Sequence, residues 1–149
     1  MRLSPDGTLL ATASGKGTLI RVFDTETAKK IAEFRRGSDY ALISDIIIDK
    51  DNKYISCASD KGTAHIFALK GGEVENKKSS LYALGGGYFG GQWSFGQFKV
   101  KDPVCKLALL EDKIFAVSTQ GRYFQGTVGK DEIKIDKQNN LLTEQDEED

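Results

Sequence analysis

The stretch SPDGTLLATASGKGTLIRVF, residues Ser4 to Phe23, is repeated 45 residues later as DKDNKYISCASDKGTAHIF, residues Asp49 to Phe67. The pairs of identical residues at this offset include Asp6 with Asp51, Ser14 with Ser59, Gly17 with Gly62, and Thr18 with Thr63. A weaker third copy, LEDKIFAVSTQGRYFQG (110–126), places Ser118 and Gly121 at an offset of 59 from the second copy. The longer second offset indicates an insertion between the second and third copies.

Each copy consists of short runs of alternating apolar and polar residues, separated by turn sequences such as PDG and GKG. A repeat of about 40 to 45 residues that is built from short strands is typical of propeller blades. We therefore expect an all-β fold, a β-propeller whose WD-repeat blades each have four antiparallel strands. In the second blade, WSFGQFKV (93–100) is expected to be the fourth strand.

The repeats divide the chain into three blades and a tail. We expect an incomplete blade at 1–40, a blade at 41–100 with a long loop at about 70–92, a blade at 101–138 and a disordered acidic tail at 139–149. Closed propellers have about 4 to 8 blades, so three blades do not close a ring. We therefore expect either that the chain is a fragment, or a short gene model, of a longer protein, or that its ends have exposed strand edges.

The composition, with 39% hydrophobic and 29% charged residues, is that of a soluble globular domain. The net charge of -1 includes the tail EQDEED (144–149), whose five acids leave 17 of the 22 against 21 bases in the remainder. This excess is too small to indicate a nucleic-acid groove. The chain has no apolar run of membrane-spanning length, and its first residues lack the apolar segment of a signal peptide. We expect a cytoplasmic protein.

Motifs that resemble catalytic sites lack the context that catalysis needs. The glycines of GGGYFG (85–90) have dinucleotide-binding spacing, but a strand-like sequence follows them where a helix is required. His65 is the only histidine, and Cys57 and Cys105 lie in separate apolar runs, where we expect buried free thiols. We therefore predict no enzyme activity, no metal site and no cofactor.

The sequence FRRG (34–37) ends an alternating run with two consecutive arginines, Arg35 and Arg36. Neighbouring side chains on a strand point to opposite faces, so these two arginines are expected to reach two different places. Without the flanking repeats, a solvated edge strand that carries charges against aggregation would be the preferred explanation of the pair.

The sequences ATASGKGTLIRVFDTETAKKIAEFRRG, CASDKGTAHIF and YFGGQWSFGQFKV together resemble the PROPPIN family, seven-bladed WD-repeat propellers that bind phosphoinositides and include the WIPI proteins of autophagy. The similarity runs from about Leu3 to about Phe124 and corresponds to about three blades, blades five to seven of that fold. It implies binding to phosphatidylinositol 3-phosphate and phosphatidylinositol 3,5-bisphosphate, and a peripheral location on autophagic (phagophore), endosomal or vacuolar membranes. It also implies a role in autophagy and endosomal trafficking with autophagy proteins as partners and no nucleic acid. The alternative is a WD-repeat scaffold that binds proteins only.

The resemblance implies two lipid sites that flank the arginine pair. The first would use Thr12, Ser14, Gly17, Thr18, Arg21 and Arg35. The second would use Arg36, Ser59, Thr63 and His65. Strand alternation agrees with this division, because the two hydroxyl sets are 45 residues apart and the FRRG strand lies between their blades.

The resemblance also implies that the insertion dips into the bilayer beside these sites. Its basic and apolar residues suit a membrane boundary: Lys77, Lys78, Leu81, Tyr82, Leu84, Tyr88 and Phe89. The alternative is that Tyr88, Phe89 and Trp93 pack on the side of the propeller, which for Trp93 is the interpretation we favour.

Overall fold

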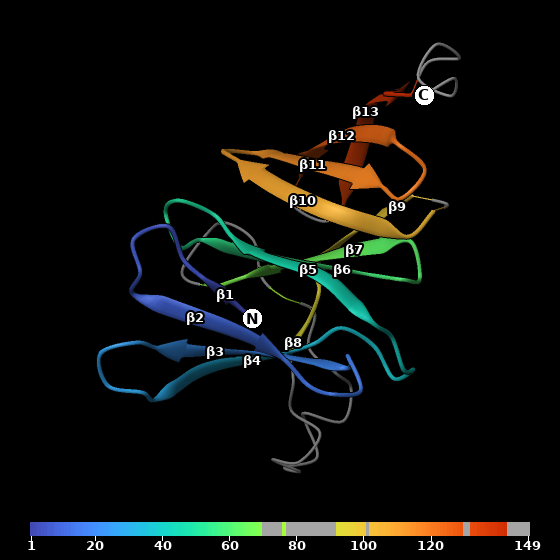
Figure 1. Cartoon of the computed structure of the whole chain (residues 1–149). Coiled ribbons are helices and arrows are strands. Elements are labelled where there is room, and N and C mark those ends of the chain that lie inside the picture. The colour runs from blue at the N-terminus through green and yellow to red at the C-terminus, as the bar shows by residue number, and fades with distance from the viewer. Residues whose placement is uncertain (70–75, 77–91, 101, 130–131, 143–149) are drawn as a thin grey trace.

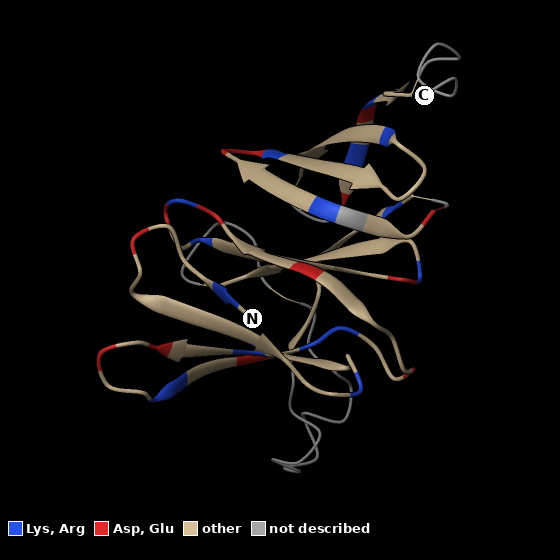
Figure 2. Ribbon diagram, in the orientation of Figure 1, with Lys and Arg blue, Asp and Glu red and all other residues tan. Residues whose placement is uncertain are grey.

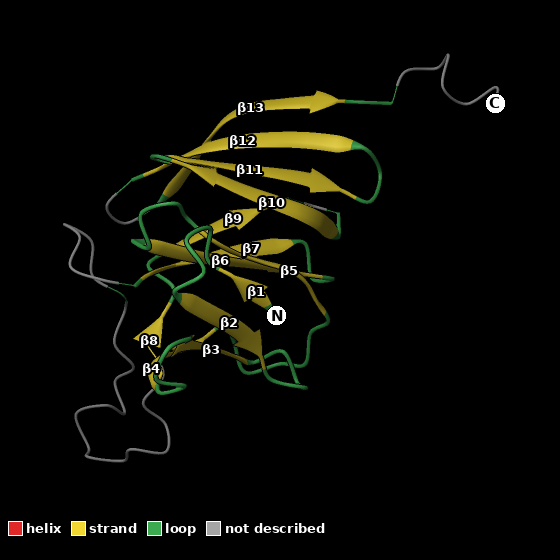
Figure 3. Ribbon diagram, turned by 60° about the vertical axis from the view of Figure 1, so that its left-hand side comes forward, coloured by secondary structure: helices red, strands yellow, loops and turns green. Residues whose placement is uncertain are grey.

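The structure is a computed structural model, and it describes residues 1–69, 76, 92–100, 102–129 and 132–142. Within these residues every regular element is a β-strand, and the strands form three sheets stacked face to face (Figure 1). Figure 3 shows the same stack from a second direction, joined by turns. The first strands of the three sheets contact one another in order, β1 with β5 and β5 with β10. This arrangement confirms the predicted all-β architecture of stacked propeller blades.

Sheet one has the order β1-β2-β3-β4-β8. Its strands are β1 (Arg2–Leu3), β2 (Leu9–Ala13), β3 (Leu19–Asp24), β4 (Lys30–Arg35) and β8 (Gln92–Trp93). Sheet two consists of β5 (Ile43–Ile48), β6 (Tyr54–Ser59), β7 (Thr63–Ala68) and β9 (Gly96–Lys99). Sheet three consists of β10 (Val104–Leu110), β11 (Lys113–Ser118), β12 (Arg122–Val128) and β13 (Ile133–Asn140). Sheet neighbours are antiparallel, except that β8 runs parallel to β4.

Two features differ from the sequence-based expectation. The predicted strand 93–100 is divided: Gln92 and Trp93 pair with Phe34 and Arg35 of sheet one, while β9 completes sheet two. The division arises because the chain turns inward between these strands, where Ser94 and Phe95 are buried. At the C-terminal end, β13 continues to Asn140 and so includes the first two residues of the expected tail.

Two apolar clusters hold the sheets together. Between sheets one and two, the rings of Phe34 and Phe67 stack with their centroids 4.9 Å apart. Between sheets two and three, Phe98 meets Phe124 edge to face at 6.2 Å. Sheet one buries one face, as the alternating burial of β2 and β3 shows, whereas β6 and β7 of sheet two are buried on both faces. Sheet two is therefore the middle layer of the stack.

The turns after β2 and β6 both depend on glycine. Gly17 and Gly62 have φ values of +67° and +69°, a left-handed conformation that other L-residues adopt at a cost. A Cβ atom at Gly17 would overlap the backbone carbonyl of Ala41, and one at Gly62 would overlap that of Val100. Each glycine thus lets its turn lie directly against the connection that leads to the next sheet.

Among the described residues, none belongs to a helix long and apolar enough to cross a membrane. The same residues contain no group of three or more His, Cys, Asp or Glu side chains placed to hold a metal ion.

Candidate functional site

Corresponding rows of side chains cross sheets one and two. In sheet one, Thr12 pairs with Arg21, which pairs with Glu33. In sheet two, Cys57 pairs with His65, and His65 pairs with Gln97. His65 thus takes the structural position of Arg21, although a single offset of 45 does not align them, because TAHIF is one residue shorter than TLIRVF.

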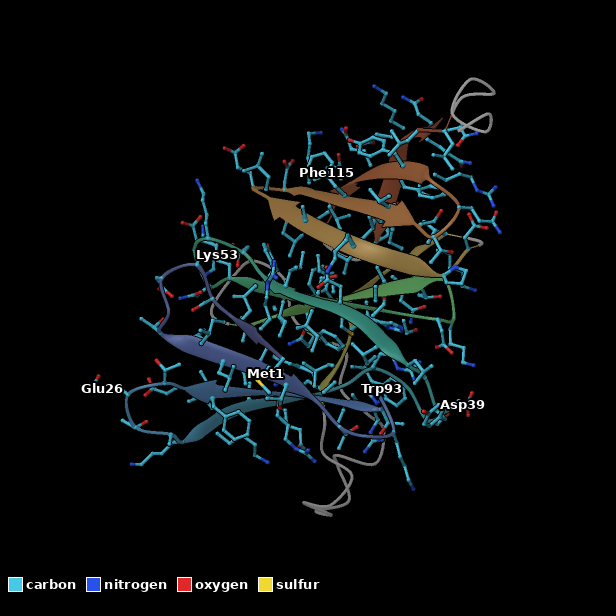
Figure 4. All side chains as sticks on the ribbon, viewed as in Figure 1. Met1, Glu26, Asp39, Lys53, Trp93 and Phe115 are labelled. Carbon is cyan, nitrogen blue, oxygen red and sulfur yellow. The ribbon has the colours of Figure 1, made fainter. Side chains whose placement is uncertain are left out.

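Charge alone does not locate the site. Figure 2 shows basic and acidic residues interspersed over the three sheets rather than gathered on one face. Figure 4 places Asp39, just after the arginine pair, at the right-hand ends of the strands, opposite Glu26 and Lys53 at the left-hand ends. Local contacts at the right-hand ends of the strands therefore define the candidate site.

Arg35 ends β4 and lies on the face of sheet one that is turned away from sheet two. Its neighbours in register are Leu19 of β3 on one side and Trp93 of β8 on the other. The side chain is half-buried, and within the described part of the chain it forms no hydrogen bond or ion pair. Its guanidinium is thus available to an anion, beside the residues of the predicted first set.

Arg36 lies in a different environment, as strand alternation predicts. It is 7% exposed, and its Nε donates a hydrogen bond to the carbonyl oxygen of Gly17 at 2.7 Å. A second guanidinium nitrogen donates to the carbonyl oxygen of Asp39. Its positive charge acts on Cys57 and His65 of sheet two. Arg36 is therefore wedged between sheets one and two, beside the predicted second set.

The turn between β2 and β3 contacts Arg36 directly. Besides the Gly17 carbonyl, the Thr18 carbonyl accepts a hydrogen bond from the Arg36 amide at 2.9 Å. The hydroxyl of Ser14 accepts hydrogen bonds from the amides of Thr18 and Leu19, at 3.2 and 3.1 Å. Gly17 and Thr18 were expected beside Arg35, but their carbonyl oxygens bond to the side chain and the backbone amide of Arg36. Leu19, the next residue, pairs with Arg35.

Arg21, expected in the first set, has an acidic partner that the sequence analysis missed. Its Nε lies 2.8 Å from Oε2 of Glu33, which also lies 3.1 Å from Nζ of Lys30. The hydrogen bond from Arg21 is the main cause of the lowered pKa of Glu33. Glu33 is two residues before Arg35 on one strand, so alternation alone places both on one face. An anion at this face competes with Glu33 for Arg21.

His65 is buried and neutral. It is 6% exposed, and its Nδ1 lies 3.2 Å from the hydroxyl oxygen of Ser94. Burial, and to a smaller extent the charge of Arg36, lowers the pKa of His65 to about 4. At pH 7 the imidazole therefore offers hydrogen bonds and no charge. Ser94 follows the insertion, so its proximity to His65 depends on tertiary packing that no local pattern reveals.

The remaining members of the second set come from the same turn and strand. Ser59 is buried, and its hydroxyl accepts a hydrogen bond from the Lys61 amide at 3.3 Å. Thr63 begins β7 and is partly buried. The neighbouring Cys57 is a buried free thiol, as expected, and burial raises its pKa to about 12. The side chain of Cys105 lies outside the described residues.

In the third copy, a salt bridge occupies the equivalent turn. Arg122 is 59 residues after Thr63. It forms a bidentate ion pair with the buried Asp102, in which Nε and Oδ2 are 2.5 Å apart. Because Asp102 neutralises the guanidinium of Arg122 within the fold, Arg122 is not available to an anion in the way that Arg35 is.

The seven insertion residues expected to contact the membrane, 77 to 89, lie outside the described residues. The ends of the insertion are described and tied together. Asn76 hydrogen bonds through its side chain to the amide and carbonyl of Ala68, each at 2.7 Å, and donates to the side-chain oxygen of Gln92 at 2.8 Å. Trp93 is partly buried beside β4, in keeping with the packing that we favoured for it.

A cavity of about 420 Å³ lies on the side of the molecule opposite the arginine pair, between the turns at 49–54 and 111–112. Its lining consists of Asp49, Lys50, Asp51, Lys53, Tyr54, Glu111, Asp112 and Val128. No residue of either predicted lipid set belongs to this lining, so the arginine pair and the cavity are separate features.

Comparison with known proteins places these features in a family. Autophagy-related protein 18 of Kluyveromyces lactis is 48% identical over 81 residues, which are 54% of this chain and 16% of that protein. Hsv2 of Kluyveromyces lactis, solved with loop 6CD complete, superposes with a TM-score of 0.75 at 26% identity over 95% of this chain and 47% of that chain. The complex of KlAtg21 with the coiled coil of AgAtg16 contains a chain that matches with a TM-score of 0.71 at 27% identity, over 94% of this chain and 41% of that one.

The chain thus spans less than half the length of these solved relatives and a smaller part of the curated one. A sequence model of the PROPPIN family matches residues 1–129, which contain both copies of the turn and the arginine pair. The chain belongs to the PROPPIN family.

Proposed function

We propose that the chain binds the phosphorylated head groups of phosphatidylinositol 3-phosphate and phosphatidylinositol 3,5-bisphosphate, at two sites that flank the arginine pair. The observation that carries this proposal is the divergence of Arg35 and Arg36. The two side chains point to opposite faces of sheet one: Arg35 pairs with Leu19, just after the first Ser-x-x-Gly-Thr turn, and Arg36 bonds to Gly17 of that turn on the side of sheet two. In this role the chain is a non-enzymatic peripheral membrane protein of autophagic, endosomal or vacuolar membranes.

The second site has the donors that a phosphate group needs. A guanidinium has five N–H donors, and Arg36 uses two of its nitrogens on the carbonyls of Gly17 and Asp39. The hydroxyls of Ser59 and Thr63 and the neutral imidazole of His65 lie on the face of sheet two that is turned towards sheet one, where Arg36 also lies. A planar, permanently charged group held by two carbonyls is suited to bidentate contact with phosphate oxygens.

The first site is more open and more strongly charged. Arg35 has no described partner, and Arg21 shares its charge with Glu33. The hydroxyls of Thr12 and Ser14 lie in the rows of Arg21 and Arg35 on the same face. A head group bound here would contact Arg35 first and would draw Arg21 partly away from its carboxylate partner.

The proposed sites are tested by titration calorimetry of the 149-residue chain with a soluble short-chain phosphoinositide. We expect a stoichiometry of two, reduced to one by Arg35→Ala or by Arg36→Ala, and no binding by the double variant. Arg35→Lys is not expected to restore the site, because an ammonium lacks the planar fork. Arg2→Ala is the matched control, since Arg2 is an exposed arginine of the same sheet. Unchanged binding by the double alanine variant would contradict the proposal.

We further propose that the insertion places apolar and basic side chains in the bilayer next to these sites. Support comes from its described end, because Trp93 pairs with Arg35 in register and so brings the insertion to the first site. Substituting Leu81, Leu84 and Phe89 with Asp is expected to abolish sedimentation with liposomes while soluble head groups still bind. Equal losses in the two assays would assign these residues to the fold instead.

Autophagy proteins are the proposed partners of the membrane-bound chain. The solved relative KlAtg21 was captured with the coiled coil of AgAtg16, so a helical coiled-coil partner is a reasonable first candidate for this family member. Co-sedimentation of a coiled-coil candidate with chain-coated liposomes, compared with bare liposomes, tests this. Equal sedimentation in both samples would argue against it.

A further inference from the structure

Lys99 occupies in sheet two the position that Arg35 occupies in sheet one. Phe34 of β4 and Phe98 of β9 are buried aromatic residues on the strands that pair with β3 and β7, and each is followed by a basic residue. Arg35 pairs with Leu19 at the start of β3, and Lys99 pairs with Thr63 at the start of β7. The sequence conceals this equivalence, because the insertion separates the two basic residues by 64 positions.

The side chain of Lys99 points towards sheet one. Phe98 packs against Phe124 of sheet three, so its neighbour on the strand points to the opposite face. That face carries His65, which lies under the charge of Arg36, and Thr63, which is in register with Lys99. Lys99 is exposed and forms no salt bridge with a described residue.

We propose that Lys99 is an additional binding residue of the second site and that its ammonium favours a head group with two ring phosphates over a head group with one. This inference rests on the proposed function and deepens it. It assigns Lys99 the contact with a phosphate that Arg36 does not reach, and thereby makes it a determinant of lipid preference.

The charges around the second site support this assignment. Arg36 has two of its nitrogens bonded to backbone carbonyls, and the buried His65 is neutral at pH 7. Without Lys99, Arg36 would therefore be the one positive charge of the predicted second set to interact with the negative charge of a second ring phosphate. Lysine has a compact charge on a flexible four-carbon stem, so Lys99 can follow a phosphate that lies away from the rigid arginine.

The test uses the Arg35→Ala variant of the whole chain, which leaves the second site alone to bind. Its affinities for inositol 1,3-bisphosphate and inositol 1,3,5-trisphosphate, the head groups of the two lipids, are measured by calorimetry with and without Lys99→Ala. We expect Lys99→Ala to weaken binding of the trisphosphate about tenfold, the scale of one charge-assisted hydrogen bond, and that of the bisphosphate less than about twofold.

Lys134→Ala is the matched control, because Lys134 is also an exposed outer-strand lysine that pairs with a threonine, Thr127 of sheet three. We expect it to change neither affinity. Equal losses from the two lysine variants, or equal losses for the two head groups, would overturn the role of Lys99. If the unmodified chain bound neither head group, the proposed function would itself fail, and the Lys99 inference with it.

Discussion

Sheets one and two have the same repeat but different surroundings, and the difference decides what one position does. Arg21 and His65 are structurally equivalent, on β3 and β7. Sheet one packs on one face only, so Arg21 remains about one-third exposed, charged and paired with Glu33. Sheet two packs on both faces, and there the same position holds a buried His65 whose pKa is lowered to about 4. Residue type and the neighbouring layer together therefore determine whether the repeated turn faces a charge or a neutral donor.

The two arginines differ in the same way. Arg35 ends its strand on the open face, and its guanidinium has no partner among the described residues, whereas Arg36 has two backbone carbonyls as partners between the sheets. The second therefore has a structural role as well as the proposed binding role. The following predictions separate these roles, in order of decreasing effect.

The largest effect is expected from the turn glycines that both sheets share. Gly17→Ala combines a left-handed backbone conformation with overlap at the Ala41 carbonyl, so we expect a loss of about 3 kcal/mol or more in the free energy of unfolding. Gly62→Ala is expected to lose a similar amount. Gly15→Ala, in the same turn as Gly17 but with open space around it, is expected to change stability by less than about 1 kcal/mol. Urea unfolding measures all three, and a tolerated Gly17→Ala would contradict the shared role of the glycines.

Arg36→Ala is expected to cost about 2 kcal/mol of stability, because it leaves the Gly17 and Asp39 carbonyls without their donor. Arg35→Ala is expected to change stability by less than about 0.5 kcal/mol, since no described residue depends on that side chain. Each variant is expected to lose one bound head group, so the binding stoichiometry is the same for both. Urea unfolding distinguishes them, because only Arg36→Ala is expected to lose much stability. Equal stabilities would mean that Arg36 has no structural role.

The buried histidine predicts a loss of stability in mild acid. Its folded pKa of about 4 lies below its usual value near 6.5, so the unfolded chain binds the proton more tightly. The stability that neutral His65 contributes to the folded chain is therefore fully present above pH 6.5 and is lost as the pH falls towards 4. Between pH 7 and pH 5 we expect a loss of about 2 kcal/mol. Glu33, whose pKa is lowered from 4.5, titrates below this range.

His65→Gln is the control for this window, because His65 is the only histidine of the chain. Its free energy of unfolding is expected to be nearly flat between pH 7 and pH 5. A variant that loses stability as steeply as the unmodified chain would show that another group causes the acid sensitivity.

Local sequence patterns predicted the stacked sheets and the divergence of the two arginines, because turn residues and strand alternation are properties of neighbouring residues. They did not predict the division of 93–100, since β8 is a strand only through its pairing with β4 across the insertion. The neutral state of His65 was not predictable either, because it depends on burial by the adjacent sheet. For the same reason the sequence did not show that Asp102 neutralises Arg122 in the third copy. Residue type and tertiary packing together distinguish the three copies.

The smallest expected effect concerns Glu33, the acid that pairs with Arg21 at the first site. Glu33→Gln keeps a hydrogen-bond acceptor for Arg21 but removes the negative charge, so an anion no longer competes with it. In an Arg36→Lys background, which leaves the first site to bind, we expect the affinity for a soluble phosphoinositide to rise about two- to threefold. Stability should change by less than about 1 kcal/mol, as is usual for a partly exposed ion pair. Glu26→Gln, in an exposed turn of the same sheet, is the control that tests whether removal of any negative charge raises the affinity. Equal gains would attribute the rise to net charge, whereas a fall in affinity with Glu33→Gln would mean that Glu33 orients Arg21 for binding.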